Sequence, residues 1–397
     1  DRFTRQRARV YGGHTGEHAC QHYARYPEDI ALMRQLGLGA YRFSLAWTRV
    51  LPGGTGRENP AGLDHYDRVV DALLENGLQP FPTLYHWDLP QALHERGGWA
   101  NRDIRHWLTE YSLLCLKRLG DRVTHWCVLN EPGAFVYLGY GTGEHAPGLK
   151  QGLKLAGVAH NVNLAQASAL RALKSQFGHC KFGCALNFAP TYPASDSPRD
   201  RGAAERHHAL TNELFLAPLV RGAYPREVGF LPGGDDLRAP LDFLGVNLYF
   251  RQVVAHQPLA NLISTRMVEG PGWKTDIGWE VWPEGMYRML MRLQADYGLP
   301  MYVTENGCAV NELPDRRRIA YLEEHLAEVA RARAEGADVR GYFCWSLLDN
   351  FEWAHGYSQR FGLVHVDFET QRRTLKDSAH WYAEQIRRGP PTTLRVR

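Results

Sequence analysis

The chain has 397 residues, enough for one large barrel domain or two ordinary domains with a sizeable buried core. Hydrophobic residues make up 44% and charged residues 22%, a globular composition that excludes a disordered chain. The net charge of +3 is too small and too evenly spread to predict a nucleic-acid partner. The seven cysteines form no C-x-x-C pair, and no run reaches the ~18 apolar residues of a membrane span. We therefore predict free thiols, a cytoplasmic location and no membrane contact.

Short β-branched and aromatic runs alternate with amphipathic helical patterns along the whole chain. The predicted strands are Ala40–Leu45, Pro80–Tyr85, His125–Leu129, Phe182–Asn187, Phe243–Leu248, Met301–Thr304 and Gly341–Ser346. The predicted helices are Pro27–Leu36, Leu63–Leu74, Ile104–Leu119, Leu153–Phe177, Ala203–Leu219, Glu284–Tyr297, Arg316–Ala334 and Ser378–Ile386. No linker or repeat divides the chain, so the pattern predicts one α/β domain over residues 1–397, with helices covering a parallel sheet.

Two α/β architectures fit this alternation. A doubly wound sheet usually has a glycine-rich phosphate turn after its first strand, but Gly139, Gly141 and Gly143 follow no strand and lack that spacing. The other architecture is the (β/α)8 barrel, whose active site lies at the carboxyl ends of the strands. We predict this barrel, with its first strand missing, because seven strands are visible and the chain opens on a helix.

Two carboxylates follow predicted strands on opposite sides of the barrel ring, at Glu131 and Glu305. A single glutamate at a strand end is commonly a solvated cap. Here each glutamate lies beside an asparagine, and His86-Trp87 and Tyr249 follow other strands. A carboxylate pair, with one acid and one nucleophile, is what retaining glycoside hydrolysis requires. The constellation therefore favours a glycosidase.

Six segments carry more specific patterns. They are Tyr41-Arg-Phe-Ser-Leu45, Tyr85-His-Trp-Asp-Leu-Pro90, Leu129-Asn-Glu-Pro132, Asn247-x-Tyr249, Thr304-Glu-Asn-Gly307 and Trp345-Ser-Leu-Leu-Asp-Asn-Phe-Glu-Trp353. In this order they strongly resemble glycoside hydrolase family 1, the β-glucosidase family, from about Val10 to the carboxyl terminus. The Asn-Glu-Pro signal is shared with barrel families that cut cellulose or xylan. The segment ending in Glu352-Trp353 separates this family from them.

The resemblance implies a retaining mechanism with a covalent glycosyl-enzyme intermediate. Glu305 would be the nucleophile and Glu131 the general acid/base, while Arg42, Asn247 and Tyr249 would support the nucleophile. The substrate-binding residues would be His86, Trp87, Asn130, Tyr249, Trp345, Glu352, Trp353 and Phe361. Trp279 and Leu138 would contact the aglycone. The resemblance implies no cofactor, and the sequence has no metal-ligand pattern such as His-Glu-x-x-His.

Glu352 and Glu131 also narrow the substrate class. Members of the family that act on 6-phosphoglycosides carry a serine, with lysine and tyrosine, where this chain has Glu352 and the following residues. Its thioglucosidase branch replaces the acid/base with glutamine, whereas this chain has Glu131. We therefore expect exo cleavage of unphosphorylated small β-glucosides or cello-oligosaccharides, as in cellulose degradation.

The chain departs from the family pattern at two places. The family usually begins with a strand whose glutamine binds the sugar, and this strand has no counterpart here, whether through truncation, engineering or omitted residues. We expect a polypeptide of only these residues to be poorly soluble and nearly inactive. Gly133 stands where the family commonly has tryptophan. A non-catalytic carbohydrate-binding protein and an endo-acting glycanase remain as alternatives, and the glucose, galactose or fucose preference and the oligomeric state stay open.

Overall fold

The structure is a computed structural model that describes residues 2–228, 231 and 235–389. Its internal contacts divide the chain into two compact units. Unit 1 comprises residues 1–39, 188–205 and 248–397, and unit 2 comprises residues 40–187 and 206–247. The assignment of residues 1–397 to a single domain stays a prediction.

Unit 2 is built around parallel strands. β1 (Ala40–Ser44) pairs with β2 (Gln79–Tyr85), β2 pairs with β3 (His125–Asn130), and β3 pairs with β4 (Lys181–Phe188). β6 (Phe243–Leu248) follows β4 in the strand order. Every residue of β6 is buried. Continuous burial of this kind is typical of a parallel strand covered on both faces.

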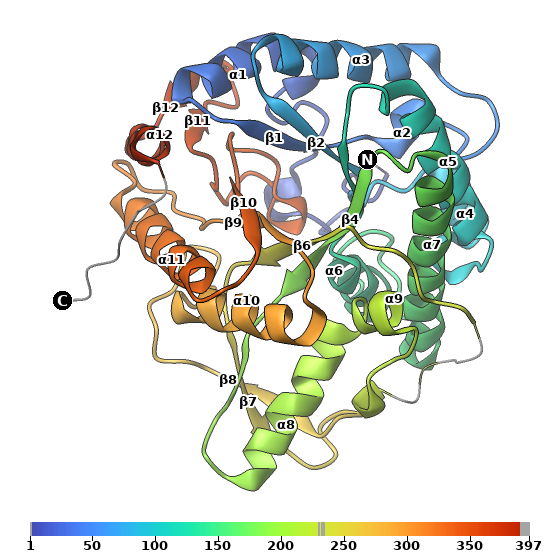
Figure 1. Cartoon of the computed structure of the whole chain (residues 1–397), viewed down its shortest axis with the longest axis vertical. Coiled ribbons are helices and arrows are strands. Elements are labelled where there is room, and N and C mark those ends of the chain that lie inside the picture. The colour runs from blue at the N-terminus through green and yellow to red at the C-terminus, as the bar shows by residue number, and fades with distance from the viewer. Residues whose placement is uncertain (1, 229–230, 232–234, 390–397) are drawn as a thin grey trace. The chain divides into compact units, whose positions relative to one another are not determined.

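Helices follow the strands of unit 2. They are α2 (Trp47–Val50), α3 (Pro60–Glu75), α4 (Gln91–Glu95), α5 (Ile104–Leu119), α6 (Pro132–Val136), α7 (Leu155–Gln176) and α9 (Ala217–Arg221). Short 3₁₀ or π turns lie at Gly98–Ala100, Tyr137–Thr142, Gly152–Lys154, Ala209–Glu213 and Arg226–Val228. α5 and α7 pack side by side (Figure 1). α8 (Pro198–His208) crosses from unit 1 into unit 2.

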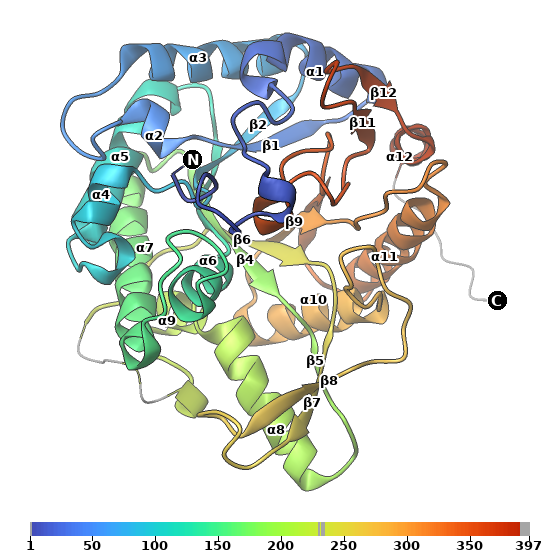
Figure 2. The same ribbon diagram turned by 180° about the vertical axis from the view of Figure 1, so that it is seen from behind.

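Unit 1 contains the parallel pair β9 (Met301–Asn306) and β10 (Val339–Cys344). Its small sheet has the order β5 (Thr191–Pro193), β7 (Gln252–His256) and β8 (Thr265–Val268) (Figure 2). A third pairing joins β11 (Val364–Val366) to β12 (Arg373–Leu375). The helices are α1 (His22–Leu36), α10 (Glu284–Tyr297), α11 (Arg316–Ala334) and α12 (Asp377–Arg388), and 3₁₀ turns lie at Tyr11–Gly13 and Trp353–His355.

All seven predicted strands are present, with ends within about two residues of the prediction. Helices α5, α10 and α11 have the predicted bounds, and α3, α7 and α12 differ by a few residues. The described part of the chain has no strand before β1, as the opening helix predicted. The seven cysteines are free, which confirms the predicted thiols. Among the described residues, no helix combines the length and apolar character needed to cross a bilayer.

Two helix predictions are wrong. The single helix predicted over Ala203–Leu219 is broken, because α8 ends at His208 and α9 begins only at Ala217. A π turn over Ala209–Glu213 follows α8 directly, and Pro218 lies in the first turn of α9, where its missing backbone N–H costs no helical hydrogen bond. Helix α1 begins at His22 and contains Pro27, rather than beginning at Pro27.

Candidate active site

Glu131 lies in unit 2, at the junction between β3 and α6. Its backbone is left-handed, with φ 45° and ψ 62°, and Pro132 is the first residue of α6. A non-glycine residue with this conformation is uncommon and costs of order 1–3 kcal/mol. The Asn130-Glu131-Pro132 sequence therefore forms an abrupt strand-to-helix turn at the carboxyl end of a parallel strand.

The side chain of Asn130 is the centre of the polar contacts in unit 2. Its Oδ1 accepts hydrogen bonds from Arg42 Nη2 at 2.6 Å and from Asn247 Nδ2 at 3.1 Å. Asn247 Nδ2 also donates to Glu131 Oε1 at 2.9 Å. The structure thus brings together Arg42 of β1, Asn130 of β3 and Asn247 of β6. Asn247 also contacts Glu131. Asn130 and Asn247 are both buried.

His86 completes this cluster as a neutral acceptor. Because Asn130 Oδ1 receives two donors, its Nδ2 faces His86 Nε2, at 3.1 Å. Burial, followed by the charge of Arg42, lowers the pKa of His86 to about 3. The imidazole is therefore neutral, with its proton on Nδ1. Trp87 Nε1 donates to the Asn130 backbone carbonyl at 3.0 Å.

Glu305 lies on β9 in unit 1 and is only 4% exposed. The Tyr249 hydroxyl donates to Glu305 Oε2 at 2.6 Å. Tyr249 is held in turn by its own carbonyl, which accepts a hydrogen bond from the Tyr321 hydroxyl at 3.0 Å. The Tyr321 hydroxyl also accepts from Asn306 Nδ2 at 2.9 Å. Tyr321 therefore links the residue after the glutamate to the tyrosine that contacts it.

Two predicted contact residues pack on Tyr249. The Trp279 ring centroid is 5.1 Å from that of Tyr249 and 5.9 Å from that of Phe361. Phe361 is buried, and its ring lies 6.2 Å from Tyr249 at a steep angle. Leu138, the other predicted aglycone contact, is half-buried in the π turn after α6 of unit 2.

The remaining predicted sugar contacts lie after β10. Trp345 is half-buried and donates its backbone N–H to the Asn306 carbonyl at 2.9 Å. Glu352 is the residue before the 3₁₀ turn Trp353–His355, and its backbone carbonyl accepts from the His355 N–H at 2.8 Å. Burial, followed by the charge of Glu305, raises the pKa of Glu352 to about 8. Glu352 is therefore mainly protonated at neutral pH before any ligand binds.

Sequence reasoning missed several residues that shape this site, above all Tyr321, Arg318 and Asp349. Tyr321 and Arg318 lie in α11, where the helical period marks buried positions but not polar partners. Asp349 lies within the Trp345–Trp353 motif, but the motif itself does not indicate a role for this residue. Among the described residues, no group of three or more His, Cys, Asp or Glu could hold a metal ion.

Comparison with known proteins identifies the family to which the chain belongs. Residues 1–390 match the model of glycosyl hydrolase family 1. The chain belongs to glycosyl hydrolase family 1. Within this family, the beta-glucosidase A of Acetivibrio thermocellus is 42% identical over 416 residues, which cover 98% of this chain and 91% of that protein. The protein is therefore a glycoside hydrolase, and the predicted family is confirmed.

Solved structures of the same family show the same fold. The family 1 b-glucosidase from Thermotoga maritima gives a TM-score of 0.96 at 41% identity and covers 99% of this chain and 92% of its own. The same enzyme in complex with glucoimidazole gives a TM-score of 0.94 at 41% identity, covering 97% of this chain and 91% of its own. This likeness confirms the predicted α/β-barrel class.

Proposed function

We propose that this protein is a retaining, exo-acting β-glucosidase that hydrolyses terminal, non-reducing, unphosphorylated β-D-glucosides through a covalent glycosyl-enzyme intermediate. The observation that carries the proposal concerns two residues that lie two positions apart in the chain. Asn247 donates to Glu131, and Tyr249 donates to Glu305. Two carboxylates at the ends of strands, each held by a neutral donor, fit an acid and a nucleophile that act on one bond. Family membership and the names of the relatives point the same way.

In the proposed reaction, Glu305 attacks the anomeric carbon while Glu131 donates a proton to the departing glycosidic oxygen. The Glu305–carbon bond forms as the carbon–oxygen bond breaks, which leaves a glycosyl ester. Glu131, now ionised, then takes a proton from water, and the water oxygen displaces Glu305 with a second inversion. Retention requires the two carboxyl groups to lie about 5–5.5 Å apart in the working enzyme.

The hydrogen bonds around Asn130 suggest how the 2-hydroxyl is bound. Its amide oxygen is occupied by Arg42 and Asn247, and one N–H faces His86. We assign its other N–H to the sugar 2-hydroxyl, a contact that strengthens in the transition state of this reaction. Trp87, held on the Asn130 carbonyl, would bind the 3-hydroxyl side together with His86.

The other glycone contacts explain the substrate class. Glu352 would accept hydrogen bonds from the 4- and 6-hydroxyls, with Trp353 beside it, Trp345 beneath the ring and Phe361 behind. A carboxyl group offers no positive charge to a 6-phosphate, so unphosphorylated sugars are expected. A clamp on the 4-hydroxyl excludes a continuing chain and favours small β-glucosides or cello-oligosaccharides. Trp279 and Leu138 would contact the aglycone, and the free cysteines fit a reducing compartment such as the cytoplasm.

The test compares Glu131→Gln with Glu305→Gln on aryl β-glucosides whose leaving groups differ in basicity. Glu131→Gln should slow poor leaving groups far more than activated ones, because an activated phenolate leaves without a proton. Glu305→Gln should abolish hydrolysis of both. NMR should show the β-anomer as the first product.

Other outcomes would favour the alternatives. An inactive wild-type protein that still binds glucosides would indicate a carbohydrate-binding protein. A fall in the viscosity of a long β-glucan before glucose appears would indicate an endo-acting glycanase. Equal losses on both leaving groups in Glu131→Gln would remove the acid role.

A further inference from the structure

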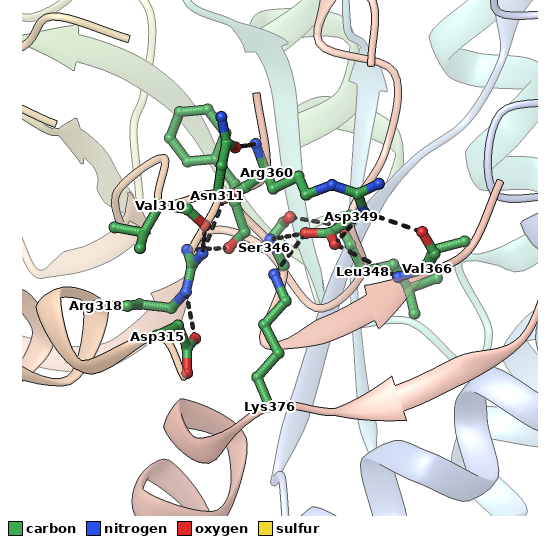
Figure 3. A network of polar contacts seen from close by, with 12 residues as sticks. Val310, Asn311, Asp315, Arg318, Ser346, Leu348, Asp349, Arg360, Val366 and Lys376 are labelled. Atoms are coloured by element: carbon green, nitrogen blue, oxygen red, sulfur yellow. Dashed lines mark hydrogen bonds and ion pairs between the residues drawn. The ribbon is translucent and has the colours of Figure 1, made fainter. Parts of the chain in front are cut away.

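A buried ionic network lies in unit 1, among residues to which the proposed chemistry gives no task. It is formed by Asp315, Arg318, Asp349, Arg360 and Lys376 (Figure 3). The side chains of Asp315 and Asp349 are fully buried, and those of Arg318 and Lys376 are 1% and 2% exposed. Burying charged groups is costly, so a network of this size needs a structural explanation.

Asp349 is the acceptor on one side of the network. Its Oδ1 accepts from Lys376 Nζ at 2.8 Å and from the Gly362 backbone N–H at 2.9 Å. Its Oδ2 accepts from Arg360 Nη1 at 2.8 Å and from the Val366 backbone N–H at 3.4 Å. One carboxylate therefore ties the segment after β10 to the segment 360–366 and to the start of α12.

On the other side of the network, Arg318 donates hydrogen bonds to backbone carbonyls. Its guanidinium donates to the carbonyls of Arg360 and Phe361, each at 2.9 Å. It also donates to the Val310 carbonyl at 2.9 Å, and to that of Cys308. Segment 360–366 is thus fixed both to Asp349 and to the loop that follows Glu305.

The backbone places Asp349 at the end of this fixed stretch. Leu363 N–H donates to the Ser346 carbonyl and Val364 N–H to the Leu347 carbonyl, both at 2.8 Å, while Asp349 N–H donates to the Val364 carbonyl at 3.0 Å. A Cβ on Gly362 would lie 2.2 Å from the Asp349 nitrogen, so the two chains meet here without room for a side chain.

The segment that leads into Glu352 and Trp353 begins directly after Asp349. Its far end is held at Tyr357, whose N–H donates to His14 Nδ1 at 3.1 Å and whose hydroxyl donates to the Thr15 carbonyl at 2.7 Å. Within the turn, Trp353 has φ 43°, a left-handed conformation that persists only where the surroundings hold it. Asp349 is the charged anchor at the near end.

Stability alone is a weak reason for this arrangement. Replacing a buried ion pair by apolar residues is often neutral or stabilising, because desolvation offsets the attraction. Burial, and then the charge of Arg318, lowers the pKa of Lys376 to about 8 despite the bond to Asp349, so the network is not free of cost. The four hydrogen bonds that Asp349 accepts do, however, fix the backbone around Asp349 in one geometry.

We propose that Asp349 is a positioning residue that sets the place of Glu352 and thereby the enzyme's selectivity for a glycone with a free 6-hydroxyl. The inference rests on the proposed function, in which Glu352 accepts hydrogen bonds from the 4- and 6-hydroxyls. Displacing such an acceptor by about 1 Å is enough to lose most of the contact.

The experiment measures kcat/KM of the full chain on an aryl β-D-glucoside and on its 6-deoxy analogue. The wild type should prefer the glucoside by about 10- to 100-fold, because the analogue leaves the buried Glu352 carboxyl without one hydrogen-bond partner. Asp349→Asn should reduce this preference to within about threefold. The preference should fall because kcat/KM decreases for the glucoside, while kcat/KM for the 6-deoxy analogue stays nearly unchanged.

Asp29→Asn is the matched control. Asp29 is also fully buried in unit 1, where its carboxylate bonds to Arg373 at 3.0 Å and to His22 at 2.7 Å rather than to the five residues of the network. Asp29→Asn should lower the unfolding temperature but keep the preference of the wild type. Arg360→Met is a milder second variant that removes one contact to Asp349, and its preference should fall at least threefold.

The results decide between the role in selectivity and a purely structural role. A lost preference in Asp349→Asn or Arg360→Met, with the preference kept in Asp29→Asn, supports the proposal. An unchanged preference in both network variants overturns it, whatever their total activity. If Asp349→Asn does not fold, Arg360→Met decides in the same way. A wild type that cleaves neither glycoside would instead refute the proposed function.

Discussion

The Tyr249 hydroxyl donates a 2.6 Å hydrogen bond to Glu305 Oε2. Tyr249 is held through its carbonyl by the Tyr321 hydroxyl, and its ring packs on Trp279. A donor fixed in this way limits the rotation of the Glu305 carboxyl and holds Oε2 in place, which leaves Oε1 as the oxygen that can attack. This restraint suits a nucleophile that must attack one carbon from one direction.

Tyr249→Phe should lower kcat/KM by about 10- to 100-fold, the worth of a hydrogen bond to a charged group. The loss should be similar for good and poor leaving groups, because the tyrosine supports the nucleophile rather than the acid. This distinguishes it from Glu131→Gln, whose effect should depend on the leaving group. Kinetics on a series of aryl β-glucosides tests both. A loss that grows with leaving-group basicity in Tyr249→Phe would contradict the assignment.

His86 should remain neutral, with its proton on Nδ1, down to about pH 4. Its pKa is lowered to about 3 by burial and by Arg42, and its Nε2 faces the Asn130 amide. Nitrogen-15 NMR of labelled histidine reports both the tautomer and the charge. Asn130→Asp should raise the pKa of His86, because a carboxylate beside Nε2 favours the imidazolium. A cationic His86 in the wild type at pH 6 would contradict this arrangement of donors.

The strands of the fold were predictable because parallel strands are buried on both faces and form continuous apolar runs. β6 is buried throughout and was predicted with its observed bounds. Strands β5, β11 and β12 have only three residues each, too few to show a period. The break after His208 was missed because apolar spacing continued through it.

For the candidate site, the sequence predicts which residue types lie at the strand ends. It does not predict which partners their side chains contact. Asn247 was expected to support the nucleophile, yet the structure places its amide on Glu131. Asp349 depends on Arg360 and Lys376, which lie 11 and 27 residues further along. Contacts at such separations are set by the tertiary fold and leave no local pattern.

Gly307, the last residue of the Thr304-Glu-Asn-Gly307 segment, should not tolerate a side chain. A Cβ there would lie 1.9 Å from the Trp345 carbonyl oxygen, which belongs to the backbone and cannot rotate away. Gly307→Ala should destabilise the fold by about 1–3 kcal/mol. It should also lower kcat/KM at least tenfold, because both Glu305 and Trp345 adjoin the clash.

Gly39→Ala is the control for this change, because nothing lies within 4 Å of its Cβ position. Urea unfolding and glucoside kinetics should show Gly39→Ala close to the wild type. If Gly307→Ala matched that control in both measurements, the close approach of the two segments would be wrong.

Glu352 should cost the enzyme stability at high pH. Its pKa is raised by burial and by Glu305 from 4.5 to about 8, so the folded state binds its proton more tightly than the unfolded chain does. Stability falls with rising pH wherever the folded state binds more protons. The cost is therefore absent below pH 4.5, grows between pH 4.5 and 8, and is complete above pH 8.

Glu352→Gln removes this titration and should stabilise the protein, with a gain that is near zero at pH 4.5 and largest above pH 8. Urea unfolding midpoints at pH 4.5, 6 and 8.5 measure it. Glu384→Gln, a change at an exposed residue of α12 that pairs with Arg388, should show no such pH-dependent gain. Activity on the glucoside should fall in Glu352→Gln while stability rises, since a residue kept for binding is often unfavourable for folding. A gain of equal size at all three pH values would show that the carboxyl does not titrate between pH 4.5 and 8.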